Sequence, residues 1–275
     1  MIALVLAGWA VIAAAQLALW WEQRRSGDAS LVDVGWSAAL VVLAGLYAVA
    51  GDGLAERRLL VGAMAAIWGG RLAWHLTRRI VASRAAGAHA EDGRYQALRA
   101  RWGPRAQRNF LVFFQVQASW SVLFSLPILV AMGAARPALG WLDAVGVAIW
   151  AIGVVGEGVA DAQLARFRAR AGSRGRTCRE GLWRYSRHPN YFFEWLTWWS
   201  YVVIAWGAPL GWLAWAGPAL MLLFLFKVTG IPYTEAQALR SRGDDYRAYQ
   251  RTTSAFVPWF PRADRPRAGG PAEEG

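Results

Sequence analysis

The stretch GLWRYSRHPNYFFEWLTWWSYVV, residues 181–203, decides how the rest of the chain is arranged. It begins as a basic loop and becomes apolar after Pro189. Proline presets φ and lacks the N–H that a first helical residue leaves unpaired, so the sequence predicts a helix that begins near Pro189. Asn190 and Tyr191 precede Glu194 by four and three residues, so all three share one helix face. An ionisable residue at the aqueous end of such a segment is a candidate functional group.

Composition points to a membrane protein. Apolar residues make up 56% of the 275 residues and come in blocks of about twenty, long enough to cross a hydrocarbon core about 30 Å thick. One Cys and three scattered His predict no metal site. The net charge of +12 does not indicate a nucleic-acid partner, because the Arg residues gather in loops that mark membrane sidedness.

The chain is therefore predicted to be an all-α, polytopic membrane protein with seven spans. We expect these at residues 1–21, 31–50, 59–76, 110–132, 138–161, 190–206 and 210–227. With the N-terminus outside and the C-terminus in the cytoplasm, most of the 30 Lys and Arg residues lie on the cytoplasmic side. The first span lacks a basic stretch and a convincing cleavage site, so we take it as a helix. A bacterial inner (cytoplasmic) membrane is the expected location.

No repeat or linker divides the chain, so a single domain is expected over residues 1–263, with the signature motifs in 181–260. The stretch EDGRYQALRARWG predicts a short amphipathic helix on the membrane surface. Residues 228–263 predict a charged helix broken at Gly243 and then an aromatic anchor bounded by proline. Residues 264–275 are polar and rich in Pro and Gly, which predicts a disordered tail.

Acids and arginines gather at the end of the fifth span. Glu157 and Asp161 are one helical turn apart, and Arg168 lies two turns beyond Asp161, so all three line one groove if the helix continues. Arginines suit phosphate oxygens and carboxylates suit hydroxyls, so these residues and Arg176 are candidates for binding an anion with a ribose. The alternative is that cytoplasmic loops are rich in Arg in any case.

The polar patch near Pro189 offers a second site. Asn190 and Glu194 can hold a carboxamide such as that of nicotinamide. The alternative is a hydrogen-bond cluster that only packs helices. Arg187 is a further phosphate candidate, and His188 is a candidate for a phosphate contact, a loop hydrogen bond or a general base. No Gly-rich motif follows a strand, and there is no Walker sequence, so a Rossmann or P-loop site is not expected.

Three other places carry candidate groups. Asp33 lies inside the second span, where an unpaired carboxylate is costly. Pairing with Arg71 satisfies it structurally, and the functional alternative is an acid that polarises a substrate carbonyl. Lys227 either snorkels or meets phosphate, and Tyr246 and Tyr249 are candidates for anchoring the tail at the interface.

These motifs give the chain a resemblance to the membrane reductases of the steroid 5α-reductase superfamily, above all to the bacterial DUF1295 branch. The segments LVDVGWS, RLAWHLTRR, GVADAQLARFRA, RHPNY, GIPYTE and YRAYQRTTSAFVPW occur in order over nearly the whole chain. The resemblance implies a seven-helix fold that opens to the cytoplasm and holds NADPH. It also implies hydride transfer to the activated C=C (enone) of a hydrophobic substrate that enters from the bilayer, with membrane lipids as the other partners.

The resemblance also implies residue roles. Asn190 and Glu194 match the nicotinamide-side pair, and Asp161, Arg168 and Arg176 match positions that bind adenosine and phosphate. The expected cofactor-binding set is Asp161, Arg168, Arg176, Arg187, His188, Asn190, Tyr191, Glu194, Lys227 and Tyr246, and the expected catalytic set is Asp33, Tyr191 and Glu194.

This chain departs from the steroid reductases in places. Phe193 stands where they have a Gly, which is expected to crowd the helix face. Glu157 stands where they have an Asn. Trp68 lies at about the place of the Tyr that they set against the substrate ketone, and Asp33 is matched only by position to their substrate-side Glu. Steroid turnover is thus not implied.

Two alternatives remain open. Isoprenylcysteine and phospholipid methyltransferases, which use S-adenosylmethionine, share the RHPxY loop and a distal Glu followed by GxxYxxY, a pattern that Glu235 and residues 243–249 also fit. The pair Asn190 and Glu194 is the discriminator, because those enzymes lack it. The other alternative is a non-catalytic lipid-binding protein.

Overall fold

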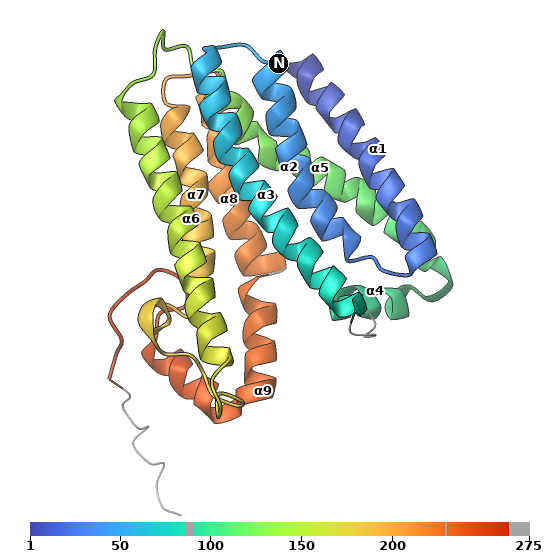
Figure 1. Cartoon of the computed structure of the whole chain (residues 1–275), viewed down its shortest axis with the longest axis vertical. Helices are drawn as coiled ribbons and strands as arrows, with labels where there is room; N and C mark the ends of the chain where they lie inside the picture. The colour runs from blue at the N-terminus through green and yellow to red at the C-terminus, as the bar shows by residue number, and fades with distance from the viewer. Residues whose placement is uncertain (86–90, 229, 264–275) are drawn as a thin grey trace, which may run out of the picture. The chain divides into compact units, whose positions relative to one another are not determined.

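A computed structural model gives the arrangement of residues 1–85, 91–228 and 230–263 (Figure 1). The predicted disordered tail at 264–275 lies outside these described residues. The longer helices are α1 (Ile2–Ser26), α2 (Leu31–Ala50), α3 (Ala55–Ala85), α4 (Gly93–Trp102), α5 (Ala106–Met132), α6 (Trp141–Arg168), α7 (Pro189–Ile204), α8 (Ala216–Leu223) and α9 (Ile231–Thr252). Four short helical turns accompany them: η1 (Gly103–Arg105), η2 (Gly181–Arg184), η3 (Gly211–Trp215) and η4 (Phe224–Val228). The described residues form no named strand, so the predicted all-α class is confirmed.

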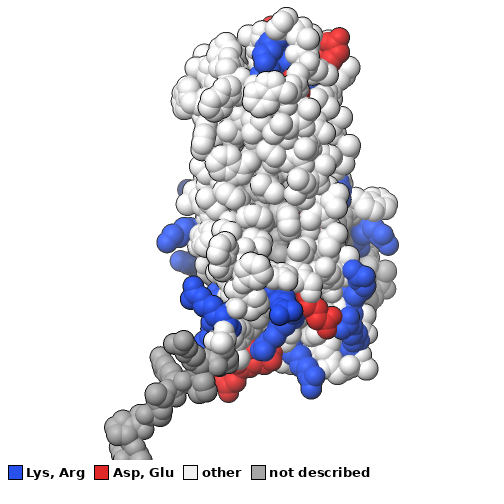
Figure 2. All heavy atoms as spheres, turned by 90° about the vertical axis from the view of Figure 1, so that its left-hand side faces the viewer, with Lys and Arg blue, Asp and Glu red and all other residues white. Residues whose placement is uncertain are grey.

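Six helical stretches among the described residues are long and apolar enough to cross a membrane. The remaining predicted span, 190–206, corresponds to α7, which has 16 residues and is therefore about 24 Å long. Figure 2 shows one face of the molecule on which a broad band carries no charge and most Lys and Arg gather toward one end. This separation is typical of a protein whose middle lies in lipid.

The chain forms two compact units, and each is described here by itself. Unit 1 consists of Met1–Trp150 and Trp198–Leu220, and unit 2 consists of Ala151–Thr197 together with the described residues from Met221 onward. The boundaries fall inside α6, α7 and α8. The expectation of a single domain over 1–263 stays a prediction.

Unit 1 is built on α1, α2, α3 and α5, which lie side by side (Figure 1). Four aromatic rings pack against one another in its core, three of the four pairs edge to face and one pair tilted. Trp36 lies 5.5 Å from Phe124 and 6.3 Å from Trp68, and Trp198 lies 5.4 Å from Trp68 and 5.2 Å from Phe124. Such contacts are favourable beyond the area that they bury. Trp68 and Trp198 are both buried, so this cluster joins α2, α3, α5 and the end of α7.

A buried ion pair fixes the start of α3 in unit 1. The Nε of Arg57 donates to Oδ1 of Asp143 over 2.7 Å, and both side chains are 3% exposed or less. The same guanidinium donates to the backbone carbonyls of Ala134, Arg136 and Ala138. Because its donors are so fully used, Arg57 holds the turn before α6 in place.

Unit 2 contains the end of α6, the start of α7, and α9. Its helices pack closely because α6 carries Gly153 and Gly156 where it meets α7. A Cβ built on Gly156 would lie 2.4 Å from the ring of Phe193. The ring of Phe193 therefore occupies space left by the missing side chain of a glycine on α6. This space explains how a Phe fits at a position where the sequence predicted crowding. At Gly243, φ of 50° and ψ of −121° interrupt α9, as the sequence predicted.

We expect Arg57→Met to destabilise the protein by about 3–5 kcal/mol, because it leaves the Asp143 carboxylate buried without its main partner. Thermal unfolding of purified protein in detergent measures this as a lower Tm. Arg105→Gln, on an exposed side chain, is the control and should leave Tm nearly unchanged. Equal Tm values for the two variants would contradict the structural role of the ion pair.

Candidate functional site

The predicted polar patch forms at the start of α7. The Nδ2 of Asn190 donates to Oδ1 of Asp161 on α6 over 3.0 Å, and the backbone N–H of Tyr191 donates to Oδ1 of Asn190 over 3.0 Å. The structure thus brings together two residues that the sequence placed in separate constellations. Glu194 lies one turn further along α7 and is partly buried.

Tyr191 connects this patch to α9. Its hydroxyl lies 3.2 Å from Oγ1 of Thr234, and its ring stacks on that of His188 with 5.3 Å between centroids and 6° between planes. The Oγ1 of Thr234 also donates to the carbonyl of Gly230. The Tyr191 ring is thereby held between the loop before α7 and the first turn of α9.

A cavity of about 360 Å³ lies between the end of α6, the loop after it, and α9. Its lining includes four arginines: Arg168, Arg174, Arg176 and Arg242. No Asp or Glu stands among the described residues that line it. Burial lowers the pKa of Arg242, and the nearby charge of Arg168 lowers it further. Cationic groups gathered in this way match the chemistry of an anion with several phosphate oxygens.

One face of α9 forms a wall of this cavity. Thr234, Gln237, Ala238, Ser241 and Arg242 all line it, and they recur at the spacing of a single helix face. The run from Thr234 to Arg242 extends for about 12 Å along the helix. Since Thr234 also meets Tyr191, the polar patch and the arginine-lined cavity adjoin each other. We call the patch and the cavity together the α6–α9 site.

The sequence predicted Arg168 and Arg176 in this site but missed Arg174, Arg242 and the small polar residues of α9. The polar residues of α9 could have been found, because Thr234, Gln237 and Ser241 have the sequence spacing of one helix face. Arg242 could not be chosen in advance, because the other cytoplasmic arginines look the same in sequence.

Glu235 lies beside the site and organises it. The Nε of Arg187 donates to Oε1 of Glu235 over 2.7 Å, and the Nε2 of His188 lies 3.2 Å from the same oxygen. Tyr246 donates to Oε1 and Gln250 to Oε2, over 3.3 and 2.8 Å. Burial alone would raise the pKa of Glu235, but the hydrogen bonds from His188 and Arg187 lower this pKa to about 2.

Three predicted cofactor residues, Arg187, His188 and Tyr246, therefore have Glu235 as their partner in this structure. Their contacts with a cofactor stay predictions. Tyr246 and Tyr249 are 3% and 1% exposed, so they are packed inside unit 2 and do not anchor the tail in lipid, which corrects that expectation. The Tyr249 hydroxyl donates to the carbonyls of Trp183 and Ser186.

The other candidates lie apart from this cluster. Lys227 is exposed in η4. Asp33 belongs to unit 1, where it accepts hydrogen bonds from Nη2 of Arg94 over 2.8 Å and from the hydroxyl of Tyr95 over 2.7 Å. The structure thus gives Asp33 partners on α4 that the sequence had not indicated. Trp68, which the sequence comparison with steroid reductases set at about the place of their ketone-facing Tyr, is packed in the aromatic core of unit 1.

No group of three or more His, Cys, Asp or Glu side chains in the described part of the chain could hold a metal ion. A family model described as "Protein of unknown function (DUF1295)" matches residues 19–253. No curated protein and no solved structure matches the chain.

Glu235→Gln should destabilise the protein by about 1–3 kcal/mol, because it removes the charge opposite a guanidinium that is 12% exposed. The measurement is Tm in detergent. Glu180→Gln is the matched control, since the bridge between Glu180 and Arg170 has side chains that are 54% and 58% exposed and contributes at most about 1 kcal/mol. If both variants lose the same small amount of stability, Glu235 does not hold the loop and α9 together.

Proposed function

Because the chain belongs to the DUF1295 family of helical membrane proteins, we propose that it is a membrane-embedded, NADPH-dependent reductase of a hydrophobic unsaturated substrate. One observation carries the proposal: a cavity lined by four arginines adjoins a patch in which Asn190 and Asp161 meet. An anion with several phosphates and a carboxamide-bearing ring matches this combination of donors and acceptors.

In this proposal, different residues of the α6–α9 site would bind different parts of NADPH. Arg168 and Arg176, with Arg174 and Arg242, would hold the phosphates. Asp161, which accepts from Asn190, would also accept from a ribose hydroxyl or from the adenine of the cofactor. Asn190 and Glu194 would hold the carboxamide, and the Tyr191 ring would limit movement beside it.

Bound NADPH supplies the hydride for reduction of an activated carbon–carbon double bond. The protein contributes binding and orientation, with Tyr191 and Glu194 at the cofactor. A substrate-side role for Asp33 stays a proposal from the resemblance alone; in unit 1 its carboxylate accepts hydrogen bonds from Arg94 and Tyr95. We further propose that the substrate enters from the bilayer, with the N-terminus outside and the arginine-rich loops in the cytoplasm of a bacterial inner membrane.

Methyl transfer from S-adenosylmethionine is the second candidate, and the Glu235 cluster favours it. The RHP loop and the distal Glu that such methyltransferases share meet directly here, through Arg187, His188 and Glu235. S-adenosylmethionine has no phosphate, so it leaves the four arginines of the cavity without a ligand. The two functions are therefore separable by ligand binding.

We expect NADPH to raise the Tm of the detergent-solubilised protein more than NADH does at equal concentration, because the cavity offers cations for the extra phosphate. Arg176→Gln should weaken NADPH binding by about tenfold or more. Arg170→Gln is the matched control, because Arg170 lies in the same segment but pairs with Glu180. A Tm shift with S-adenosylmethionine alone would favour methyl transfer and remove the reductase proposal.

Glu194→Ala should lose NADPH affinity while the protein still inserts and folds, because the variant removes an acceptor for the carboxamide N–H₂. Isothermal titration with NADPH measures the affinity, and size-exclusion chromatography checks the fold. Unchanged NADPH affinity in this variant would assign Glu194 to helix packing only.

A further inference from the structure

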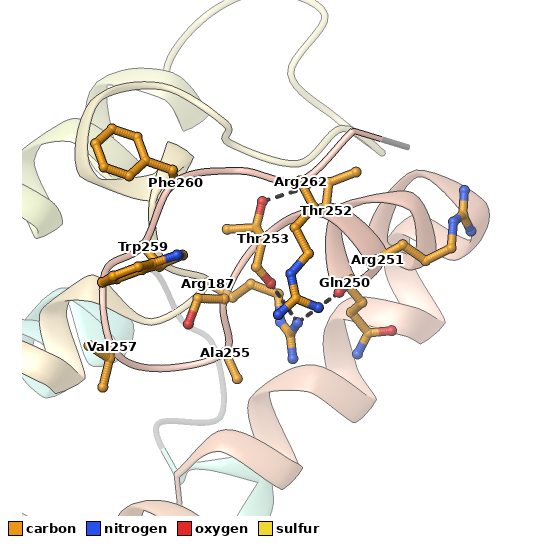
Figure 3. Close-up of a pocket in the computed structure, with 11 residues that line it drawn as sticks. Arg187, Gln250, Arg251, Thr252, Thr253, Ala255, Val257, Trp259, Phe260 and Arg262 are labelled. Atoms are coloured by element: carbon orange, nitrogen blue, oxygen red, sulfur yellow. Dashed lines mark hydrogen bonds between the residues drawn. The ribbon is translucent and has the colours of Figure 1, made fainter. Parts of the chain in front are cut away.

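A second cavity, of about 430 Å³, lies beyond α9 and does not belong to the α6–α9 site (Figure 3). Residues 250–255, 257, 259, 260 and 262 line it together with Arg187. Three of its lining residues are arginines: Arg187, Arg251 and Arg262. None of the described residues that line it is acidic. We call it the C-terminal pocket.

Backbone hydrogen bonds hold the C-terminal pocket against the loop that leads into α7. The N–H of Arg187 donates to the carbonyl of Ser254 over 2.8 Å, and the N–H of Trp259 donates to the carbonyl of Tyr185 over 2.9 Å. Arg187 lies only two residues before the first residue of α7, Pro189. The pocket is thus fixed to the chain at the point where the predicted sixth span begins.

Side-chain packing gives the same placement. The ring of Phe256 lies 5.8 Å from Phe192 and 5.7 Å from Trp195, both in the first two turns of α7, and 5.3 Å from Phe226 in η4. Phe256 is 8% exposed. The segment after α9 is therefore wedged among the aqueous ends of two predicted spans, which is the level of lipid head groups.

The outer rim of the pocket is apolar and exposed. Val257, Trp259 and Phe260 are 53%, 67% and 75% exposed. Large aromatic residues with this exposure are typical of the belt in which rings lie among lipid head groups. Together with the arginines, they give the pocket a cationic interior and an apolar rim at the same level.

The arginines of the pocket differ in the hydrogen bonds that they make within the protein. Arg187 donates to Glu235 and to the carbonyls of Gln250 and Thr253. Arg262 is held by its backbone, whose N–H donates to the carbonyl of Thr252 over 2.8 Å. Figure 3 shows its side chain directed into the pocket, toward the guanidinium of Arg187. Two guanidinium groups directed into one cavity favour an anion there.

We propose that the C-terminal pocket binds the phosphate of an anionic phospholipid, with Arg262 holding the phosphate and Trp259 and Phe260 lying beside its acyl chains. Basic pockets next to membrane helices suit such head groups. The exposed aromatic rim selects a lipid over a soluble phosphate compound, because only a lipid covers it. This proposal does not depend on NADPH.

The test uses the full-length protein in detergent, with lipid binding counted by native mass spectrometry. Phosphatidylglycerol should bind, phosphatidylcholine should bind at least tenfold more weakly, and inorganic phosphate should compete with phosphatidylglycerol only at far higher concentration. Arg262→Gln should weaken phosphatidylglycerol binding about tenfold. Trp259→Ala should weaken lipid binding while leaving any competition by phosphate unchanged.

Arg101→Gln, on the exposed surface of α4, is the control for lost charge and should bind phosphatidylglycerol as the unchanged protein does. Far-ultraviolet circular dichroism establishes that each variant is folded at the temperature of the measurement. Equal binding of the two lipids, or equal loss in Arg262→Gln and Arg101→Gln, would overturn the proposal. Competition by inorganic phosphate at the lipid's own concentration would overturn it in favour of a soluble ligand.

Discussion

The carboxylate of Glu235 is the interaction on which unit 2 depends. It takes hydrogen bonds from Arg187 and His188 in the loop before α7 and from Tyr246 and Gln250 further along α9. A partly buried carboxylate is costly unless its oxygens are paired, and here the pairing joins two segments far apart in sequence. The position of α9 follows from it.

That position creates two cationic cavities. Along its first three turns, α9 contributes the polar face from Thr234 to Arg242 to the α6–α9 site. After its last turn the chain returns to the loop before α7 and encloses the C-terminal pocket. Arg187 donates to Glu235 and also lines the C-terminal pocket. A ligand that contacts Arg187 in that pocket would therefore act on a residue whose hydrogen bond to Glu235 helps to hold α9. The walls of both cavities thus depend on the position of α9, which the Glu235 hydrogen bonds hold.

Much of the fold could be predicted because the physics is local. Apolar blocks of sufficient length predict the membrane helices, Pro189 predicts the start of α7, and Gly243 predicts the interruption of α9. The stretch EDGRYQALRARWG predicts α4, whose N-cap Asp92 accepts from the N–H of Arg94. Each of these signals is contained in a few consecutive residues.

The partners of the charged residues could not be predicted in the same way. For Asp33 the sequence offered pairing with Arg71 or a role at the substrate, and it did not indicate Arg94 and Tyr95, from which Asp33 accepts hydrogen bonds and which helical spacing cannot relate to it. The same holds for Arg187 and Glu235, which are 48 residues apart. The sequence predicted that Phe193 would crowd its helix face. The space for its ring comes from Gly156 on another helix, which the local sequence does not reveal. Hydrogen bonds between distant segments follow from packing, so sequence periodicity gives the candidates but not their pairs.

The most direct measurement of the central claim is the modification of individual arginines by phenylglyoxal, followed by mass spectrometry with and without NADPH. If the α6–α9 site holds the phosphates, NADPH should protect Arg168, Arg176 and Arg242, while Arg170, which lies in the same segment and pairs with Glu180, stays equally reactive. Uniform reactivity of all four arginines at saturating NADPH would contradict the account.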